Sequence, residues 1–181
     1  MRDTWQMFTG ALPSEMCNHM ITNFLTIDPE DAKTYSSQED VRRSKIRWVT
    51  NEVGLMDILL KYVNLANAVA FNVDIQQEMG EMQFTEYDAE YYGKYDWHHD
   101  INWQNEKNFD RKLSISVQLS NPDGYVGGEF QFDEVESPDP EEFGKQGSIL
   151  IFPSYLRHRV TEVTDGTRYS LVSWVRGPRW R

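Results

Sequence analysis

The feature that most constrains the fold is an alternation of apolar and polar residues in the second half of the chain. It is clearest at residues 113–120, where every second residue is large and apolar. Because successive side chains of a strand point to opposite faces of a sheet, this period of two predicts strands. Similar runs occur, with turns such as 121–124 between them, at residues 71–75, 82–87, 129–132, 148–152, 158–163 and 169–175. About eight short strands of this kind predict a β-sandwich or jelly roll.

The first 70 residues are predicted to be mainly helical. A helix is expected over residues 15–25, with Ser14 as its N-cap and an apolar face formed by Cys17, Ile21, Phe24 and Leu25. A second helix is expected over residues 55–70, with a core-facing side formed by Leu55, Leu59, Tyr62, Ala66 and Val69. A short strand over residues 46–49 lies between them. We therefore expect one domain over residues 1–181, in which a helical support region (1–70) braces a β core (71–177).

Composition excludes several classes of protein. With 18 Lys and Arg against 29 Asp and Glu, the net charge is −11, which argues against a general phosphate-binding face and hence a nucleic-acid partner. The single cysteine, Cys17, excludes an internal disulfide and any multi-cysteine metal site. No stretch comes near the roughly 18–20 apolar residues that span a bilayer, and the N-terminus lacks the apolar core of a signal peptide. We expect a cytoplasmic protein with no membrane partner, and the sequence leaves the oligomeric state open.

The densest run of charge covers residues 133–142, which hold six acids and two prolines. Such a segment cannot build a packed core, so we expect a mobile, solvated loop that either folds over a cleft or is an inert turn.

The histidines indicate a metal site. Of the four, His19 is expected at the surface of the first helix, whereas His98, His99 and His158 fall at predicted strand ends. In the segment His98-His99-Asp100, strand alternation places His98 and Asp100 on one side and His99 on the other. With His158 as a distant third ligand, these residues would form a 2-His-1-carboxylate triad, which suits non-haem Fe(II). The alternative is a set of partly exposed histidines with no ligand role.

Arg168 begins a predicted strand ten residues after His158 and shares a face with Ser170, Val172 and Trp174. A guanidinium in the interior of a jelly roll is costly unless it meets an anion, and its planar fork suits a carboxylate. A dicarboxylate that chelates the metal at one end could therefore terminate on Arg168. The alternative is an ordinary surface arginine.

Several motifs appear together and in a fixed order. They are Tyr-Asp-Trp-His-His-Asp at 95–100, Arg-Lys-Leu-Ser-Ile-Ser-Val at 111–117, Gly-Gly-Glu-Phe at 127–130, Gly-Ser-Ile-Leu-Ile-Phe-Pro at 147–153, and the segment 158–170. In this ordered set, from about residue 71 to residue 177, the chain resembles the 2-oxoglutarate- and Fe(II)-dependent dioxygenases. It looks most similar to their prolyl 4-hydroxylase-like branch, including its small microbial and viral members.

The resemblance implies a double-stranded β-helix, a form of jelly roll, and a role for each matching residue. His98, Asp100 and His158 match the iron ligands, and Arg168 matches the residue that pairs with the distal carboxylate of 2-oxoglutarate. Tyr87 matches a tyrosine that donates a hydrogen bond to the same carboxylate, with Tyr95 as the rival candidate. Trp174 matches an aromatic position that lines the pocket. A carboxylate at Asp100 leaves no site for halide, which argues against halogenation.

The resemblance also implies an activity and its cofactors: hydroxylation of a substrate C–H, with 2-oxoglutarate and O2 consumed and succinate and CO2 released. Fe(II) is the expected metal, replaceable by Mn or Zn in a crystal, and ascorbate is a further cofactor that the branch allows.

We expect the substrate to be peptidyl proline in a peptide or protein. Collagen-type enzymes carry lysine where this chain has Arg168, whereas the hypoxia type uses arginine. Nucleic-acid demethylases carry a second arginine where this chain has Trp174. Aromatic residues that suit a proline-rich peptide are expected around the pocket: Trp97, Trp103, Tyr125 and Tyr155. The alternatives are hydroxylation of a small molecule or another side chain, and a non-catalytic cupin-like binding module.

Overall fold

Two antiparallel sheets form the body of the protein. The computed structural model describes residues 3–32, 41–50 and 52–180. The larger sheet has the order β1-β10-β7-β12-β5-β4-β2, with β8 paired to β12, and the smaller sheet has the order β3-β6-β11-β9. The strands are β1 (Gln6–Phe8), β2 (Glu30–Asp31), β3 (Arg42–Arg43), β4 (Lys45–Val49), β5 (Met82–Asp88), β6 (Lys94–His98), β7 (Phe109–Gln118), β8 (Tyr125–Gly127), β9 (Phe130–Phe132), β10 (Ile149–Pro153), β11 (His158–Val160) and β12 (Val163–Pro178).

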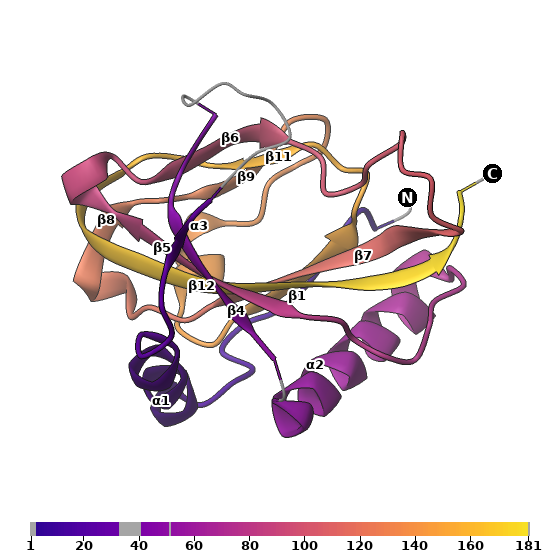
Figure 1. Cartoon of the computed structure of the whole chain (residues 1–181), viewed down its shortest axis with the longest axis horizontal. Helices are drawn as coiled ribbons and strands as arrows, with labels where there is room; N and C mark the ends of the chain where they lie inside the picture. The colour runs from indigo at the N-terminus through magenta and orange to yellow at the C-terminus, as the bar shows by residue number, and fades with distance from the viewer. Residues whose placement is uncertain (1–2, 33–40, 51, 181) are drawn as a thin grey trace.

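The two longer helices cover one face of the larger sheet, and the smaller sheet covers the other face. The α-helices are α1 (Ser14–Phe24), α2 (Val53–Ala66), which continues into a π-helical turn (Asn67–Phe71), and α3 (Pro140–Gly144). Short 3-10 turns occur at Ala89–Tyr91 and Pro122–Gly124. Figure 1 shows α1 and α2 below the larger sheet and β6, β9 and β11 above it. The resulting order of layers is helices, larger sheet, smaller sheet, as in the expected jelly roll.

Strands β5 and β7, in the middle of the larger sheet, are buried on both faces. The face toward the helices is apolar and includes Phe84, Ile115 and Val117. The face toward the smaller sheet is polar in β7, where Ser114 and Ser116 are buried. A period of two is typical of strands with one face in water. In these two strands the polar face also lies inside the molecule, between the two sheets.

The predicted helices are present with shifted ends and faces. The first helix begins at Ser14 itself, after Pro13, so Ser14 is not its N-cap. In the second helix Leu55, Leu59 and Ala66 are buried as expected. Val69 is 74% exposed instead of core-facing. It lies in the π-helical turn that follows α2, where the change of helical period rotates the side chain away from the sheet.

The strand expected at residues 71–75 does not form. Phe71 ends the π-helical turn, and residues 72–75 lie outside any strand. The backbone amide and carbonyl of Val73 bond instead to the side-chain amide of Asn67, at 2.9 Å each. Because Asn67 satisfies both backbone groups, the segment needs no neighbouring strand.

One helical stretch, Val53–Phe71, is long and apolar enough to cross a membrane, judged by length and composition alone. It contains Asp57 and Lys61, so it is not the continuous apolar run that the sequence was expected to lack. In this fold the stretch packs its buried side chains into the core beneath the larger sheet; these are Leu55, Leu59, Val63 and Ala66.

The acidic run at residues 133–142 is attached to the body of the protein rather than being a simple loop. The backbone carbonyl of Glu136 accepts a hydrogen bond from the Trp5 indole at 2.7 Å, and Pro138 is buried. The Asp139 carboxylate caps α3 by accepting from the backbone amides of Glu141 and Glu142.

The packing of α2 predicts a difference between two identical substitutions on one helix. Leu59 is completely buried, whereas Leu65 is 55% exposed. We expect Leu59→Ala to lower the free energy of unfolding by about 2–5 kcal/mol. Leu65→Ala should change it by less than about 0.5 kcal/mol. Urea denaturation of both variants measures the difference, and equal losses would contradict the observed docking of α2.

Candidate metal centre and its pocket

A cavity of about 880 Å³ lies between the two sheets. Its wall combines residues from both sheets and from the loop before β7. It includes every residue that the sequence suggested for binding the metal and the co-substrate: Tyr87, Tyr95, His98, Asp100, His158, Arg168 and Trp174. Segments far apart in the sequence thus contribute to one pocket, because the strand order of the jelly roll brings them together.

His98 and His158 occupy opposite positions on neighbouring strands. His98 is the last residue of β6, and it pairs in register with His158, the first residue of β11. The Nδ1 atom of His98 lies 2.8 Å from the Asp96 carbonyl, and that of His158 lies 2.9 Å from the Leu156 carbonyl. A carbonyl can only accept, so each Nδ1 carries the proton and each Nε2 keeps a free lone pair. Both rings are thus prepared to bind a metal through Nε2.

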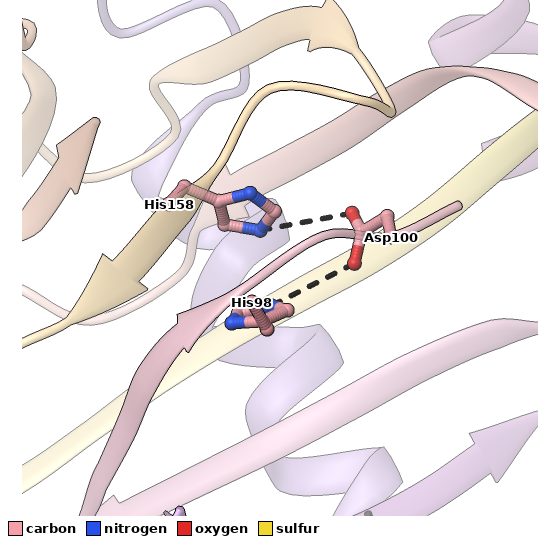
Figure 2. Close-up of side chains that lie close together, drawn as sticks. All are labelled: His98, Asp100 and His158. Carbon is pink, nitrogen blue, oxygen red and sulfur yellow. Dashed lines mark ion pairs between the residues drawn. The ribbon is translucent and has the colours of Figure 1, made fainter. Parts of the chain in front are cut away.

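Asp100 lies in the bend after β6 and faces both imidazoles. One carboxylate oxygen is 3.7 Å from Nε2 of His98, and the other is 3.7 Å from Nε2 of His158 (Figure 2). The Ser114 hydroxyl donates to the Asp100 carboxylate at 2.6 Å, which fixes its orientation. The candidate ligand atoms of the three residues all lie within 4.8 Å of one another.

The protonation states of these residues suit metal binding. Burial, together with the neighbouring His158, lowers the pKa of His98 to about 3, and burial also lowers the pKa of His158. Burial alone would raise the pKa of Asp100, but the two imidazoles, the Arg111 guanidinium and the Ser114 hydroxyl hold it at about 2. At neutral pH the imidazoles are therefore neutral and the carboxyl is ionised, the forms that coordinate a metal.

The chemistry of this donor set fits Fe(II). Two imidazole nitrogens and one carboxylate oxygen form a 2-His-1-carboxylate set, and the three residues line the open cavity. Such a set leaves coordination positions free, whereas a closed structural zinc site has four protein ligands. His99 is not among the residues whose candidate ligand atoms come together, and its Nδ1 bonds to the Tyr155 carbonyl at 2.7 Å.

Arg168 is buried in the wall of the same cavity, with a relative exposure of 2%. Its Nη1 atom has no hydrogen-bond partner among the described residues. Tyr87 lies directly opposite on the neighbouring strand β5, and the guanidinium carbon is 5.6 Å from the centroid of its ring. A buried guanidinium with an unsatisfied donor is costly, so this end of the cavity suits an anion.

Tyr95 and Trp174 occupy other parts of the wall. The Tyr95 ring stacks on the His98 imidazole with centroids 3.4 Å apart, so it supports a candidate ligand rather than Arg168. Trp174 lines the cavity, and the Arg111 guanidinium lies 3.7 Å from its ring centroid.

The aromatic residues expected around the pocket are placed differently from one another. Trp103 lines the cavity and is 62% exposed. Tyr125 lines a smaller adjoining pocket, and Trp97 and Tyr155 line neither. Trp97 instead lies beneath the Arg159 guanidinium. The predicted aromatic groove is therefore reduced to one side chain at the main cavity.

Two contributors to the site were missed by sequence reasoning. Ser114 orients Asp100. The alternation of its strand in the sequence predicts which face of the sheet Ser114 occupies, but not which side chain it contacts. Gly128 has a positive φ of 62°, and a Cβ there would lie 2.8 Å from Cδ of Arg168. Glycine at this position therefore leaves room for the arginine side chain. The Gly127-Gly128 pair was visible in the sequence, but its proximity to Arg168 was not.

Comparison with known proteins identifies relatives of this chain. The family described as the 2OG-Fe(II) oxygenase superfamily matches residues 82–176. A PKHD-type hydroxylase of Synechococcus sp. (strain CC9311) is 37% identical over 83 residues, which are 46% of this chain and 36% of that protein. A PKHD-type hydroxylase of Idiomarina loihiensis is 31% identical over 110 residues, 60% of this chain and 48% of that protein. The matches thus span less than half the length of these curated relatives.

Solved structures similar to this one share its fold at low sequence identity. The viral collagen prolyl hydroxylase of Paramecium Bursaria Chlorella virus-1, in its 2OG complex, has a TM-score of 0.72 and 17% identity, with 97% of both chains covered. A Pseudomonas putida prolyl-4-hydroxylase has a TM-score of 0.72 and 18% identity, with 98% and 94% covered. A Trichoplax adhaerens prolyl hydroxylase in complex with a hypoxia inducible factor peptide fragment has a TM-score of 0.72 and 16% identity, with 95% and 83% covered.

These likenesses confirm the double-stranded β-helix that the sequence predicted. The family match includes all three candidate metal ligands and Arg168, and it extends over more than half of the chain. This chain therefore belongs to the 2OG-Fe(II) oxygenase superfamily.

Proposed function

We propose that this chain is an Fe(II)- and 2-oxoglutarate-dependent dioxygenase that hydroxylates a substrate C–H and releases succinate and CO2. The observation that carries the proposal is one cavity that contains both a 2-His-1-carboxylate group and a buried arginine with an unsatisfied donor. The first suits Fe(II), and the second suits the distal carboxylate of 2-oxoglutarate.

The metal would be held by Nε2 of His98, Nε2 of His158 and a carboxylate oxygen of Asp100. When bound, it supplies the activation of O2 that is coupled to decarboxylation of the co-substrate. The protein's own contribution is orientation: the Asp96 and Leu156 carbonyls set the imidazole tautomers, and Ser114 holds the carboxylate. Each ligand is thus held in the tautomer or ionised form that binds a metal.

The co-substrate would bind with its distal carboxylate on Arg168. Of the two candidate tyrosines, we assign the supporting hydrogen bond to Tyr87, because it lies opposite Arg168 in the strand register. Tyr95 stacks on His98 and would act on the metal side. Trp174 would form part of the wall between these two ends of the cavity.

For the substrate we propose peptidyl proline, which would make the enzyme similar in activity to procollagen-proline 4-dioxygenases. Support comes from the names of the three similar structures, all prolyl hydroxylases, one of which holds a peptide fragment. The single cysteine is compatible with the cytoplasm as the site of the reaction. A panel of proline-containing peptides, read for a mass increase of one oxygen atom, distinguishes this substrate from other C–H groups.

Removing any metal ligand should abolish both metal binding and turnover. We expect His98→Ala, Asp100→Ala and His158→Ala each to weaken Fe(II) binding by more than about 100-fold, because loss of a ligand exceeds the effect of losing its supporting group. Succinate release that depends on Fe(II), O2 and 2-oxoglutarate should disappear in parallel. Anaerobic Fe(II) titration and succinate assays measure the two effects.

The matched control is His99→Ala, which removes the neighbouring imidazole that bonds to the Tyr155 carbonyl. This variant should retain Fe(II) affinity within about twofold and most of the succinate release. A His158→Ala protein that binds iron and turns over like the wild type would overturn the assignment.

Arg168→Lys should weaken 2-oxoglutarate binding roughly tenfold to 100-fold, because lysine keeps the charge but loses one of two parallel hydrogen bonds. Tyr87→Phe removes one neutral donor and should cost roughly 0.5–1.5 kcal/mol. Tyr95→Phe keeps the stacked ring and should leave the affinity unchanged. Titration of 2-oxoglutarate into the anaerobic Fe(II) protein, followed by the charge-transfer band, gives all three affinities. Unaltered affinity in Arg168→Lys would show that this arginine is not the anchor.

A further inference from the structure

Positive charge is concentrated in the cavity of a chain whose net charge is −11. Among the described residues, the wall holds Arg42, Lys107, Arg111, Arg168 and Arg176, but Asp100 as its one acid. The whole chain has 18 Lys and Arg against 29 Asp and Glu. A concave site with walls of one sign focuses the field and raises the local concentration of ions of the opposite sign.

Two of these arginines lie directly opposite each other. Arg111 of β7 pairs in register with Arg176 of β12, and both line the cavity. Like charges at directly opposite positions destabilise a sheet. Each guanidinium lies over an aromatic ring, Arg111 at 3.7 Å from the Trp174 centroid and Arg176 at 4.7 Å from that of Phe109. Arg111 also donates to the Asp100 backbone carbonyl at 3.3 Å, a neutral acceptor. An anion bound beside both guanidinium groups would offset their mutual repulsion.

This arginine pair lies beyond the candidate metal centre, away from Arg168. Trp174 pairs in register with Ser114, whose hydroxyl holds Asp100, so the metal centre is near this level of β12. Arg176 lies two residues beyond Trp174 on β12, and Arg168 lies six residues before it, so the two arginines are on opposite sides of this level. The pair is therefore at the end of the cavity that the co-substrate would leave open.

The remaining cations have neutral neighbours. Arg42 donates to Ser44 Oγ at 2.8 Å and to Gln83 Oε1 at 2.7 Å. Lys107 lies 5.5 Å from the centroid of the Phe109 ring. Among the described residues, no carboxylate forms an ion pair with the side chains of Arg42, Lys107 and Arg176.

We propose that the substrate is an acidic peptide segment, in which Asp or Glu side chains next to the target residue bind the Arg111–Arg176 pair. The inference rests on the proposed function, which already assigns Arg168 to the co-substrate and Asp100 to the metal. Planar guanidinium forks bind carboxylates with paired hydrogen bonds. A nucleic acid offers anions too, but its charges extend beyond the cavity, where this chain's acids outnumber its bases and repel a long polyanion.

The test uses fluorescein-labelled repeats of Glu-Pro, Gln-Pro and Lys-Pro, ten residues each, and a single-stranded oligonucleotide of ten nucleotides. Binding to the anaerobic protein loaded with Fe(II) and 2-oxoglutarate is followed by fluorescence anisotropy. We expect the Glu-Pro repeat to bind at least about tenfold more tightly than the Gln-Pro repeat and to weaken as salt rises. The Lys-Pro repeat and the oligonucleotide should bind more weakly still.

Substitutions of Arg176 test whether this arginine binds the acidic peptide. Arg176→Gln should weaken binding of the Glu-Pro repeat by roughly tenfold, and the charge reversal Arg176→Glu should weaken it further. The control Lys61→Gln removes one positive charge from the exposed side of α2, on the opposite face of the larger sheet, and should leave binding unchanged. Circular dichroism verifies that each variant is folded.

Three outcomes would overturn the inference: equal binding of the Glu-Pro and Gln-Pro repeats, tightest binding of the oligonucleotide, or undiminished binding of the Glu-Pro repeat by Arg176→Glu. Failure of the proposed function is seen separately, because the wild-type protein would then show no charge-transfer band with Fe(II) and 2-oxoglutarate.

Discussion

The site depends on a difference between the two faces of the larger sheet: one face packs against the helices, and the other lines the cavity. The helices cover one face, and the apolar side chains of β5, β7 and β12 pack there as an ordinary core. The other face is also buried, but it carries serines, an arginine and a tryptophan. A second, smaller apolar cluster lies between the sheets and includes Phe130, Phe152 and Val160. Because the main apolar core is built on the helix side, the rest of this interior can remain polar and partly open.

Buried charges between the sheets reduce the stability of the protein without ligands, which indicates that ligands bind in the cavity. A buried Arg168 with an unsatisfied nitrogen, and two arginines opposite each other in register, would not favour the folded state by themselves. Burial lowers the pKa values of His98 and His158, so both imidazoles are neutral beside the ionised carboxyl of Asp100. The three side chains direct their lone pairs at one place. Each unfavourable feature becomes favourable when a charge of the appropriate sign is bound nearby, and each belongs to the same cavity.

Much of this could be predicted from the sequence because the relevant information is local. The period of two located strands β7, β10 and β12, and the His-x-Asp spacing placed His98 and Asp100 together. The segment at residues 71–75 was misassigned because alternation does not reveal side-chain bonds to the backbone. Asn67, only six residues before Val73, makes the two bonds that replace a neighbouring strand.

The features that could not be predicted depend on pairing between strands. The support of Asp100 by Ser114, the space that Gly128 leaves for Arg168, and the opposition of Arg111 and Arg176 all require the register. A one-residue shift would move each of these side chains to the other face. Trp97, which was expected near the pocket, is a different case, because strand alternation alone predicts where it lies. It precedes His98 in β6, so its side chain points to the opposite face, where it lies under Arg159.

The most direct test of the central claim is a crystal structure of the protein grown anaerobically with Mn(II) and 2-oxoglutarate. The account predicts one metal ion bonded to Nε2 of His98, Nε2 of His158 and a carboxylate oxygen of Asp100, with the distal carboxylate of 2-oxoglutarate on the Arg168 guanidinium. A metal bound by other residues, or a co-substrate whose distal carboxylate lies away from Arg168, would contradict it.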